Sequence, residues 1–220
     1  MNAAVAEPLA PEITLALAWS GAAVRAPLAI AFQLDRRLAR IVQRTTEPML
    51  GQMRLAWWRE ALGKPVTERP SGDAVLDGIG RHWQGREQAL IKMVDAWELF
   101  VTAQDLGPGE AARFGTGRGA FFAALVPDPD ETPLVPRLLA AGHCWAAADA
   151  SQAVSRPDER GALIASGVAA RRETGRMSGE WRGLAVLGAL GARSLDAGGI
   201  PLMDGRGASL VAYRAAIFGA

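Results

Sequence analysis

The stretch TTEPMLGQMRLAWWREAL (Thr45–Leu62) is the most informative part of this chain, because it combines a helical pattern with charges in unexpected places. At 100° per residue, Leu50, Trp57 and Ala61 lie within about 20° of one line along a helix. Such a stripe is typical of the face that packs on the rest of a protein. We therefore expect an amphipathic helix over this segment, with the stripe facing inwards.

The polar residues of this helix divide between two faces. Gln52 and Arg59 lie opposite the stripe, where solvent-facing residues belong. Arg54 instead projects into the apolar arc, between Trp57 and Trp58. An arginine in such surroundings needs a carboxylate, a phosphate or an aromatic face, because an unpaired buried charge is too costly. Arg54 is therefore a candidate for a buried ion pair or for a ligand site.

The composition is that of a folded, rather apolar protein. Half of the 220 residues are hydrophobic, 21% are charged, and the net charge is +1. This balance gives no overall electrostatic case for binding nucleic acid. The single cysteine, Cys144, excludes an internal disulfide and fits a reducing compartment, so we expect a cytoplasmic protein. His143 and His82 are too few histidines for a zinc site of the His/Cys kind.

Helical patterns recur along the whole chain, whereas strand patterns and hairpin turns are nearly absent. We predict one all-α domain over residues 1–220, a bundle of about eight to ten helices, with residues 1–10 flexible. Pro11 and Pro27 are expected to open the first two helices. No apolar run reaches the ~18 residues that would suggest a membrane span, and the N-terminus is a poor signal peptide. We therefore expect at most a peripheral membrane contact.

Two further helices direct a charge towards the interior. Asp35 falls in the middle of one apolar stripe, and Glu98 lies about 80° from the centre of another. One interpretation joins Asp35, Arg54 and Glu98 in a buried ion-pair cluster, in which loss of one member costs on the order of 3–5 kcal/mol. The other makes these three residues, with Trp57 and Trp58, a ligand site in which Arg54 binds phosphate.

Other charged and glycine-rich segments have simpler interpretations. Four arginines share another sector of the Asp35 helix and form either a solvated face or a basic wall for an anionic ligand. Asp73 and Asp77 fall in the first turn of a helix, where acids are favoured. The run Gly115–Gly119 resembles a phosphate loop only superficially, because no strand precedes it. The four arginines of the Asp35 helix are Arg36, Arg37, Arg40 and Arg44. A separate acidic group, Asp128, Asp130 and Glu131, is expected in a solvated loop.

The quoted stretch resembles a segment of bacterial squalene/phytoene-synthase-like proteins. The similarity extends to APLAIAFQLDRRLARIV upstream, to VDAWELF (Val94–Phe100) and GTGRGAFFAAL (Gly115–Leu125), and more loosely to GLAVLGALGARSL (Gly183–Leu195). It implies the isoprenoid-synthase fold, an all-α bundle around a central cavity. Active members join two prenyl diphosphates head to head, and they hold Mg²⁺ with two aspartate-rich motifs on facing helices.

The chain departs from this family where those two motifs should fall. Only Asp35 remains in the first region, near residues 35–41, and it stands among arginines. Only Asp149 remains in the second region, within Gly142–Val154. The resemblance therefore implies a divergent, shortened member of the family that lacks intact aspartate-rich motifs.

Two functions are compatible with this pattern. The first is a non-catalytic protein that needs no cofactor and binds a prenyl lipid or a protein partner; the resemblance includes a branch with a respiratory complex I assembly factor. The alternative is an active prenyl transferase of isoprenoid biosynthesis, which condenses prenyl diphosphates with Mg²⁺ held by Asp35, Asp73, Asp77 or Glu98. The loss of the facing aspartate clusters favours the first function.

Overall fold

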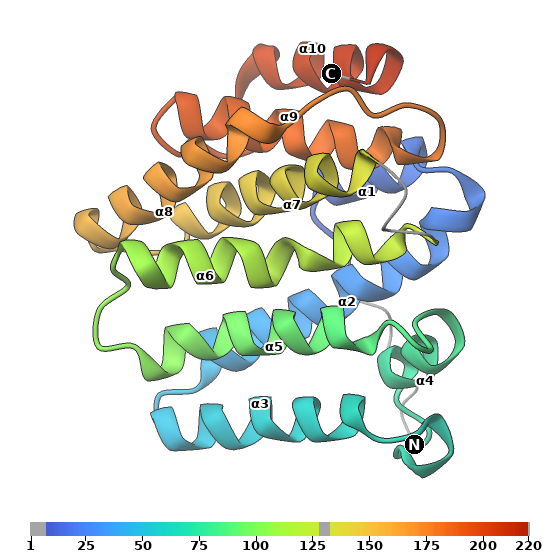
Figure 1. Cartoon of the computed structure of the whole chain (residues 1–220). Coiled ribbons are helices and arrows are strands. Elements are labelled where there is room, and N and C mark those ends of the chain that lie inside the picture. The colour runs from blue at the N-terminus through green and yellow to red at the C-terminus, as the bar shows by residue number, and fades with distance from the viewer. Residues whose placement is uncertain (1–7, 128–132, 220) are drawn as a thin grey trace.

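A computed structural model describes residues 8–127 and 133–219, and within these ranges every regular element is a helix (Figure 1). This confirms the all-α prediction. The α-helices are α1 (Pro11–Trp19), α2 (Ala22–Arg44), α3 (Pro48–Gly63), α4 (Ala74–His82), α5 (Glu87–Thr102), α6 (Pro108–Gly119), α7 (Leu134–Ser151), α8 (Pro157–Ala170), α9 (Arg182–Asp196) and α10 (Gly205–Phe218). Short 3₁₀ helices are η1 (Val66–Glu68), η2 (Ala120–Leu125), η3 (Arg171–Glu173) and η4 (Gly179–Trp181).

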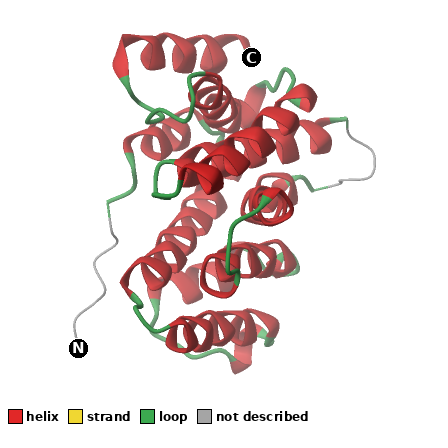
Figure 2. Cartoon of the chain, turned by 90° about the vertical axis from the view of Figure 1, so that its left-hand side faces the viewer, coloured by secondary structure: helices red, strands yellow, loops and turns green. Residues whose placement is uncertain are grey.

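Six of these helices form a stack in which each packs on the next. The order runs α3, α5, α6, α7, α9 and α10, from the bottom to the top of Figure 1. Outside the stack, α2 packs on α4 and α5, α1 packs on α9, and α8 covers α6 and α7. Figure 2 shows the described part of the chain from the side, as helices joined by loops. Consequently α3 and α10 lie at the two ends of the stack, and each has one main neighbour in it.

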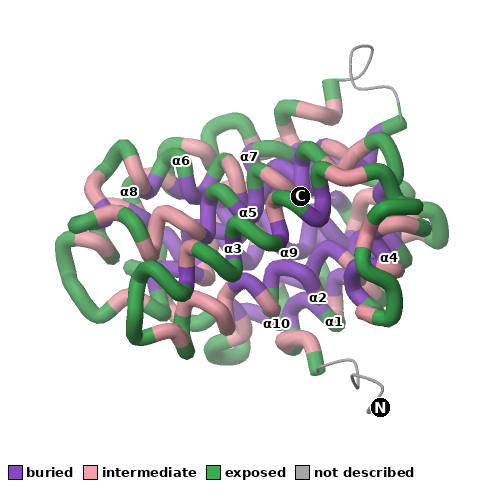
Figure 3. Tube along the Cα trace, turned by 90° about the horizontal axis from the view of Figure 1, so that it is seen from below, coloured by how far each residue is buried: buried purple, intermediate pink, exposed green. Residues whose placement is uncertain are grey.

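The core lies where α2, η2 and α7 meet. Phe32, Phe121, Phe122 and Trp145 form an aromatic cluster there, and the Phe121 and Phe122 ring centroids are 4.9 Å apart. All four side chains are fully or almost fully buried. Buried positions gather in the middle of the bundle and exposed ones at its rim (Figure 3). Burial of this aromatic surface contributes to the stability of the fold.

The glycine-rich run is helical and allows α6 and α7 to approach each other. A Cβ atom on Gly119 would collide with the backbone of Gly142, and one on Gly142 would collide with Gly119. A Cβ on Gly115 would likewise collide with the imidazole of His143. These glycines therefore bring two backbones into contact, and nothing in their geometry forms a phosphate loop.

One expected helix start is wrong. Pro27 was expected to open a helix, but α2 begins at Ala22 and contains Pro27 in its second turn. Pro27 lies beyond the first turn, so its missing N–H removes one helical hydrogen bond, the one to the carbonyl oxygen of Ala23. The carbonyl oxygen of Pro27 accepts a hydrogen bond of 2.9 Å from the indole of Trp83, which fixes α4 against α2.

Some predictions fall outside the described ranges. The acidic group Asp128, Asp130 and Glu131 lies in 128–132, and most of the segment 1–10 lies in 1–7. Within 8–127 and 133–219, none of the helices combines the length and the apolar character that crossing a membrane requires.

Candidate functional site

The face of α3 that packs inwards differs from the expected stripe. Gly51, Leu55 and Trp58 are buried, whereas Leu50 and Trp57 are both 44% exposed. Apolar residues occupy almost the whole circumference of this helix, so its periodicity could not decide which side faces the core. The Trp58 ring is fixed inside by the guanidinium of Arg37, which lies 5.8 Å from the ring centroid.

Arg54 is not the hub of a buried cluster, and that interpretation is wrong. Its side chain is exposed and donates a hydrogen bond of 3.2 Å to the hydroxyl of Thr45. Glu98 instead pairs with Arg59, the arginine expected to face solvent. Arg59 also donates to Asp95 at 2.7 Å. Arg59 therefore pairs with Glu98 as was expected of Arg54, and Arg54 faces solvent as was expected of Arg59. The reason is the rotation of α3 about its axis, which directs Arg59 towards α5.

Asp35 does point into the interior as predicted, but its partner comes from another helix. The carboxylate is 4% exposed and accepts two hydrogen bonds from Arg118 of α6, each 2.8 Å long. The same oxygen that meets Nε of Arg118 also accepts a 2.8 Å bond from the indole N–H of Trp97. This bidentate arrangement is the strong form of the arginine–carboxylate pair.

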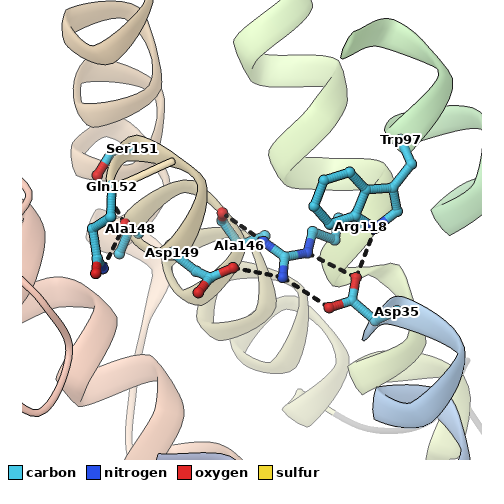
Figure 4. Close-up of polar contacts among 8 residues, drawn as sticks. All are labelled: Asp35, Trp97, Arg118, Ala146, Ala148, Asp149, Ser151 and Gln152. Carbon is cyan, nitrogen blue, oxygen red and sulfur yellow. Dashed lines mark hydrogen bonds and ion pairs between the residues drawn. The ribbon is translucent and has the colours of Figure 1, made fainter. Parts of the chain in front are cut away.

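Arg118 joins three helices at one point (Figure 4). Its guanidinium is 2.6 Å from a carboxylate oxygen of Asp149 and donates a 3.3 Å bond to the carbonyl of Ala146. The rings of Trp145 and Trp97 flank it, with centroids 4.3 and 4.8 Å from the guanidinium carbon. Burial lowers the pKa of Arg118, but the two carboxylates outweigh this and raise it, so the side chain stays charged.

A third carboxylate approaches the cluster from α1. Glu12 is 8% exposed, and burial raises the pKa of its carboxyl group. The charge of Asp149 raises this pKa further, whereas the charge of Arg118 lowers it. Glu12 therefore holds its proton to a higher pH than an exposed glutamate does, and a protonated carboxyl can donate a hydrogen bond.

A cavity of about 480 Å³ opens beside this cluster. Its size falls within the range of about 300–1,000 Å³ that ligand pockets occupy. Apolar and aromatic side chains form most of its wall, and five charged residues also line it. The apolar and aromatic lining consists of Leu9, Ala10, Ile13, Phe32, Ala39, Val42, Trp97, Phe100, Trp145, Ala150, Ala153 and Val154. The charged lining residues are Glu12, Asp35, Arg36, Arg118 and Asp149.

Two of the acidic residues considered as Mg²⁺ ligands, Asp35 and Asp73, already have partners within the protein. Both oxygens of Asp35 are engaged by Arg118. Asp73 caps α4, because its carboxylate accepts a 2.9 Å hydrogen bond from the backbone N–H of Val75. It also pairs with Arg37. Burial raises the pKa of Asp73, but the hydrogen bonds and the charge of Arg37 outweigh this and lower it. Across the described ranges, no group of three or more histidine, cysteine or acidic side chains is arranged to hold a metal ion.

Two residues of this site escaped the sequence-based reasoning. Arg118 lies between two glycines in a run that was considered only as a possible phosphate loop. The sequence nevertheless indicates that Arg118 is paired, because a single arginine among small and aromatic residues of a helix needs a buried partner. Glu12 belongs to the N-terminal segment, which the sequence pattern marks only as a poor signal peptide. Trp57, placed in the expected ligand site, lies on the outside of α3 and does not line the cavity.

A second cavity, of about 540 Å³, lies between α6, α7 and α8. In its wall, Nε2 of His143 is 2.7 Å from the hydroxyl of Ser166, and Nδ1 is 3.3 Å from the hydroxyl of Thr116. Burial lowers the pKa of His143, so the imidazole is neutral at pH 7. Ser166 lies inside α8, where backbone N–H groups serve the helix and cannot form an oxyanion hole. We interpret this pair as a helix-to-helix contact.

Comparison with protein-family models, with curated proteins and with solved structures found no match for this chain. Any statement of function therefore depends on the site described above.

Proposed function

We propose that the chain is a divergent squalene/phytoene-synthase-like protein that binds a neutral prenyl lipid in the cavity and does not catalyse prenyl transfer. The position of Arg118 carries this proposal. Its guanidinium lies between Asp35 and Asp149, the single acids left in the two regions where the sequence resemblance expects metal-binding motifs. A guanidinium there pairs with both carboxylates, which a catalytic site would reserve for Mg²⁺.

The charges around the cavity favour a ligand without a diphosphate. Three carboxylates and two guanidinium groups line it, so its formal charge is about −1 when all are ionised and zero when Glu12 is protonated. Arg118 is already satisfied by two carboxylates and the carbonyl of Ala146. A diphosphate would bring further negative charge beside Asp35 and Asp149, whose counter-charge Arg118 already supplies, and this disfavours binding. A prenyl alcohol or another uncharged isoprenoid matches the apolar wall and can accept a hydrogen bond from a protonated Glu12.

The alternative function, an active prenyl transferase, makes an opposite prediction for one assay. The protein is incubated with Mg²⁺ and farnesyl or geranylgeranyl diphosphate, and released pyrophosphate is measured. We expect no release above that of a heat-denatured sample. Release that disappears in Asp35→Asn or Asp149→Asn would establish the transferase and overturn the proposal.

Binding is tested with farnesol and the intrinsic fluorescence of the protein, because Trp97 and Trp145 line the cavity. We expect a saturable change in emission that Ala39→Phe abolishes by filling the cavity. Ala56→Phe is the matched control, since Ala56 lies on the exposed side of α3. The proposal fails if farnesol produces no saturable change, or if both variants weaken binding equally. A protein partner, a role in respiratory-complex assembly and a cytoplasmic location stay predictions.

A further inference from the structure

Helix α10 has its large apolar residues on the outside. Its buried positions are four alanines, Ala208, Ala212, Ala215 and Ala216, which allow a close approach to α9. Leu210, Tyr213 and Phe218 are 62%, 59% and 57% exposed. Single exposed apolar residues are ordinary, but a helix whose large apolar side chains lie on its outer face, with only alanines buried on its inner face, is not. This face is therefore expected to have a partner.

The exposed residues of α10 form one continuous band, which we call the α10 face. Taking Leu210 as the reference, Ile217 lies about 20° away and Tyr213 about 60° away on the helix circumference. Two arginines lie within about 40° of Leu210. The band runs the length of a helix of about 21 Å, at the upper end of the stack (Figure 1). The α10 face consists of Arg206, Leu210, Tyr213, Arg214, Ile217 and Phe218.

The charges of this helix indicate the chemistry of its partner. Between Gly205 and Phe218, α10 carries two arginines and no acidic residue. Arginine can extend its charged end towards phosphate groups while its aliphatic part stays on an apolar surface, and tyrosine favours the boundary between the two media. A second copy of the chain is disfavoured, because pairing two α10 faces brings four arginines together.

From this combination we infer that the α10 face docks on the surface of an anionic lipid bilayer. The helix lies flat in the interface, with Leu210, Ile217 and Phe218 inserted among the acyl chains. Arg206 and Arg214 then meet lipid phosphates at the head-group level. This is the arrangement of an interfacial amphipathic helix, whose affinity combines buried apolar area with attraction to anionic head groups. It is independent of the cavity and of any ligand there.

The exposed apolar residues of α3 provide a matched comparison. Met53 and Trp57 are also exposed, at the opposite end of the stack. Their neighbourhood has mixed charges, because Glu60 pairs with Lys64 at 2.6 Å on the same helix. A bilayer bound at α10 cannot reach α3, so changes there should leave lipid binding intact.

The experiment is co-flotation of the full chain with vesicles made of equal parts of phosphatidylcholine and phosphatidylglycerol, or of phosphatidylcholine alone. We expect binding to the anionic vesicles and at least about tenfold weaker binding for Leu210→Gln/Phe218→Gln. Arg206→Gln/Arg214→Gln should weaken it by about fivefold per arginine. Met53→Gln/Trp57→Gln should bind like the unchanged protein. Circular dichroism checks that each variant is folded.

Several outcomes would overturn the inference. These are no binding of the folded protein to anionic vesicles, equal binding to neutral ones, or an equal loss in the α3 variant. A dimer of the unchanged protein in solution that the α10 variants convert to a monomer would assign the face to self-association instead. Farnesol binding is measured on the same variants, so failure of the lipid surface and failure of the cavity proposal are distinguished.

Discussion

Replacement of Arg118 by methionine tests how much the stability of the protein depends on the ion pairs that Arg118 forms with Asp35 and Asp149. The guanidinium is 3% exposed and makes two 2.8 Å bonds to Asp35, one 2.6 Å contact with Asp149 and a bond to Ala146. Methionine keeps the length of the side chain but leaves the carboxylate of Asp35 buried without a counter-charge. Breaking a buried pair in this way costs about 3–5 kcal/mol.

The assay is urea unfolding followed by circular dichroism and tryptophan fluorescence. In a thermal melt, a loss of this size corresponds to a fall in Tm of about 6–20 °C for a chain of this length. Arg59→Met is the matched control, because Arg59 also has two carboxylate partners but is 36% exposed, and it should cost no more than about 1 kcal/mol. A second control adds Asp35→Leu to Arg118→Met, which removes the orphaned charge and should restore part of the loss.

Two results would refute this reasoning. One is a cost below about 1 kcal/mol for Arg118→Met, which would mean that solvent reaches the cluster. The other is strict additivity of Arg118→Met and Asp35→Leu, since residues in direct contact should show a coupling energy of about 0.5–3 kcal/mol.

The remaining predictions concern other buried groups. Because the folded protein raises the pKa of Glu12 above 4.5, its contribution to stability is present below pH 4.5 and is lost as the pH rises through the raised pKa. Glu12→Gln should therefore flatten the fall in unfolding free energy between pH 4.5 and neutrality, and an unchanged slope would contradict this. Burial raises the pKa of Cys144 to about 12, so a thiol reagent should modify it only after unfolding; rapid labelling of the native protein would disprove the assigned burial. Gly119→Ala should cost about 1–3 kcal/mol in urea unfolding, because the added methyl meets the backbone of Gly142. Gly161→Ala, with open space around it on α8, should be neutral or stabilising by up to about 1 kcal/mol; equal effects of the two changes would exclude the close approach of α6 and α7.

The sequence predicted the helical class, most of the helices and the inward direction of Asp35. These follow from local patterns, because an apolar stripe and a helix cap depend on neighbouring residues. Asp73, for example, caps α4 at the place where its position suggested a first-turn acid. Such features need no knowledge of which helices meet.

The partners of the inward charges could not be predicted in the same way. Asp35 and Arg118 are 83 positions apart in the chain, and the close approach of α6 and α7 through Gly119 and Gly142 determines where Arg118 lies. The rotation of α3 about its own axis was equally undetermined, because Leu50 and Leu55 are both apolar and either could face the core. Only packing against α5 places Arg59, and not Arg54, next to Glu98.

The counter-charge between Asp35 and Asp149 belongs to the polypeptide itself. A bound ion can be removed by a chelator, exchanged for another metal or lost when its concentration in the cell falls. Arg118 cannot be removed or exchanged in this way, because it is part of the chain and keeps its proton at every pH at which the protein is folded. Asp35 and Asp149 therefore have their partner from the moment the chain folds, whatever the supply of divalent cations.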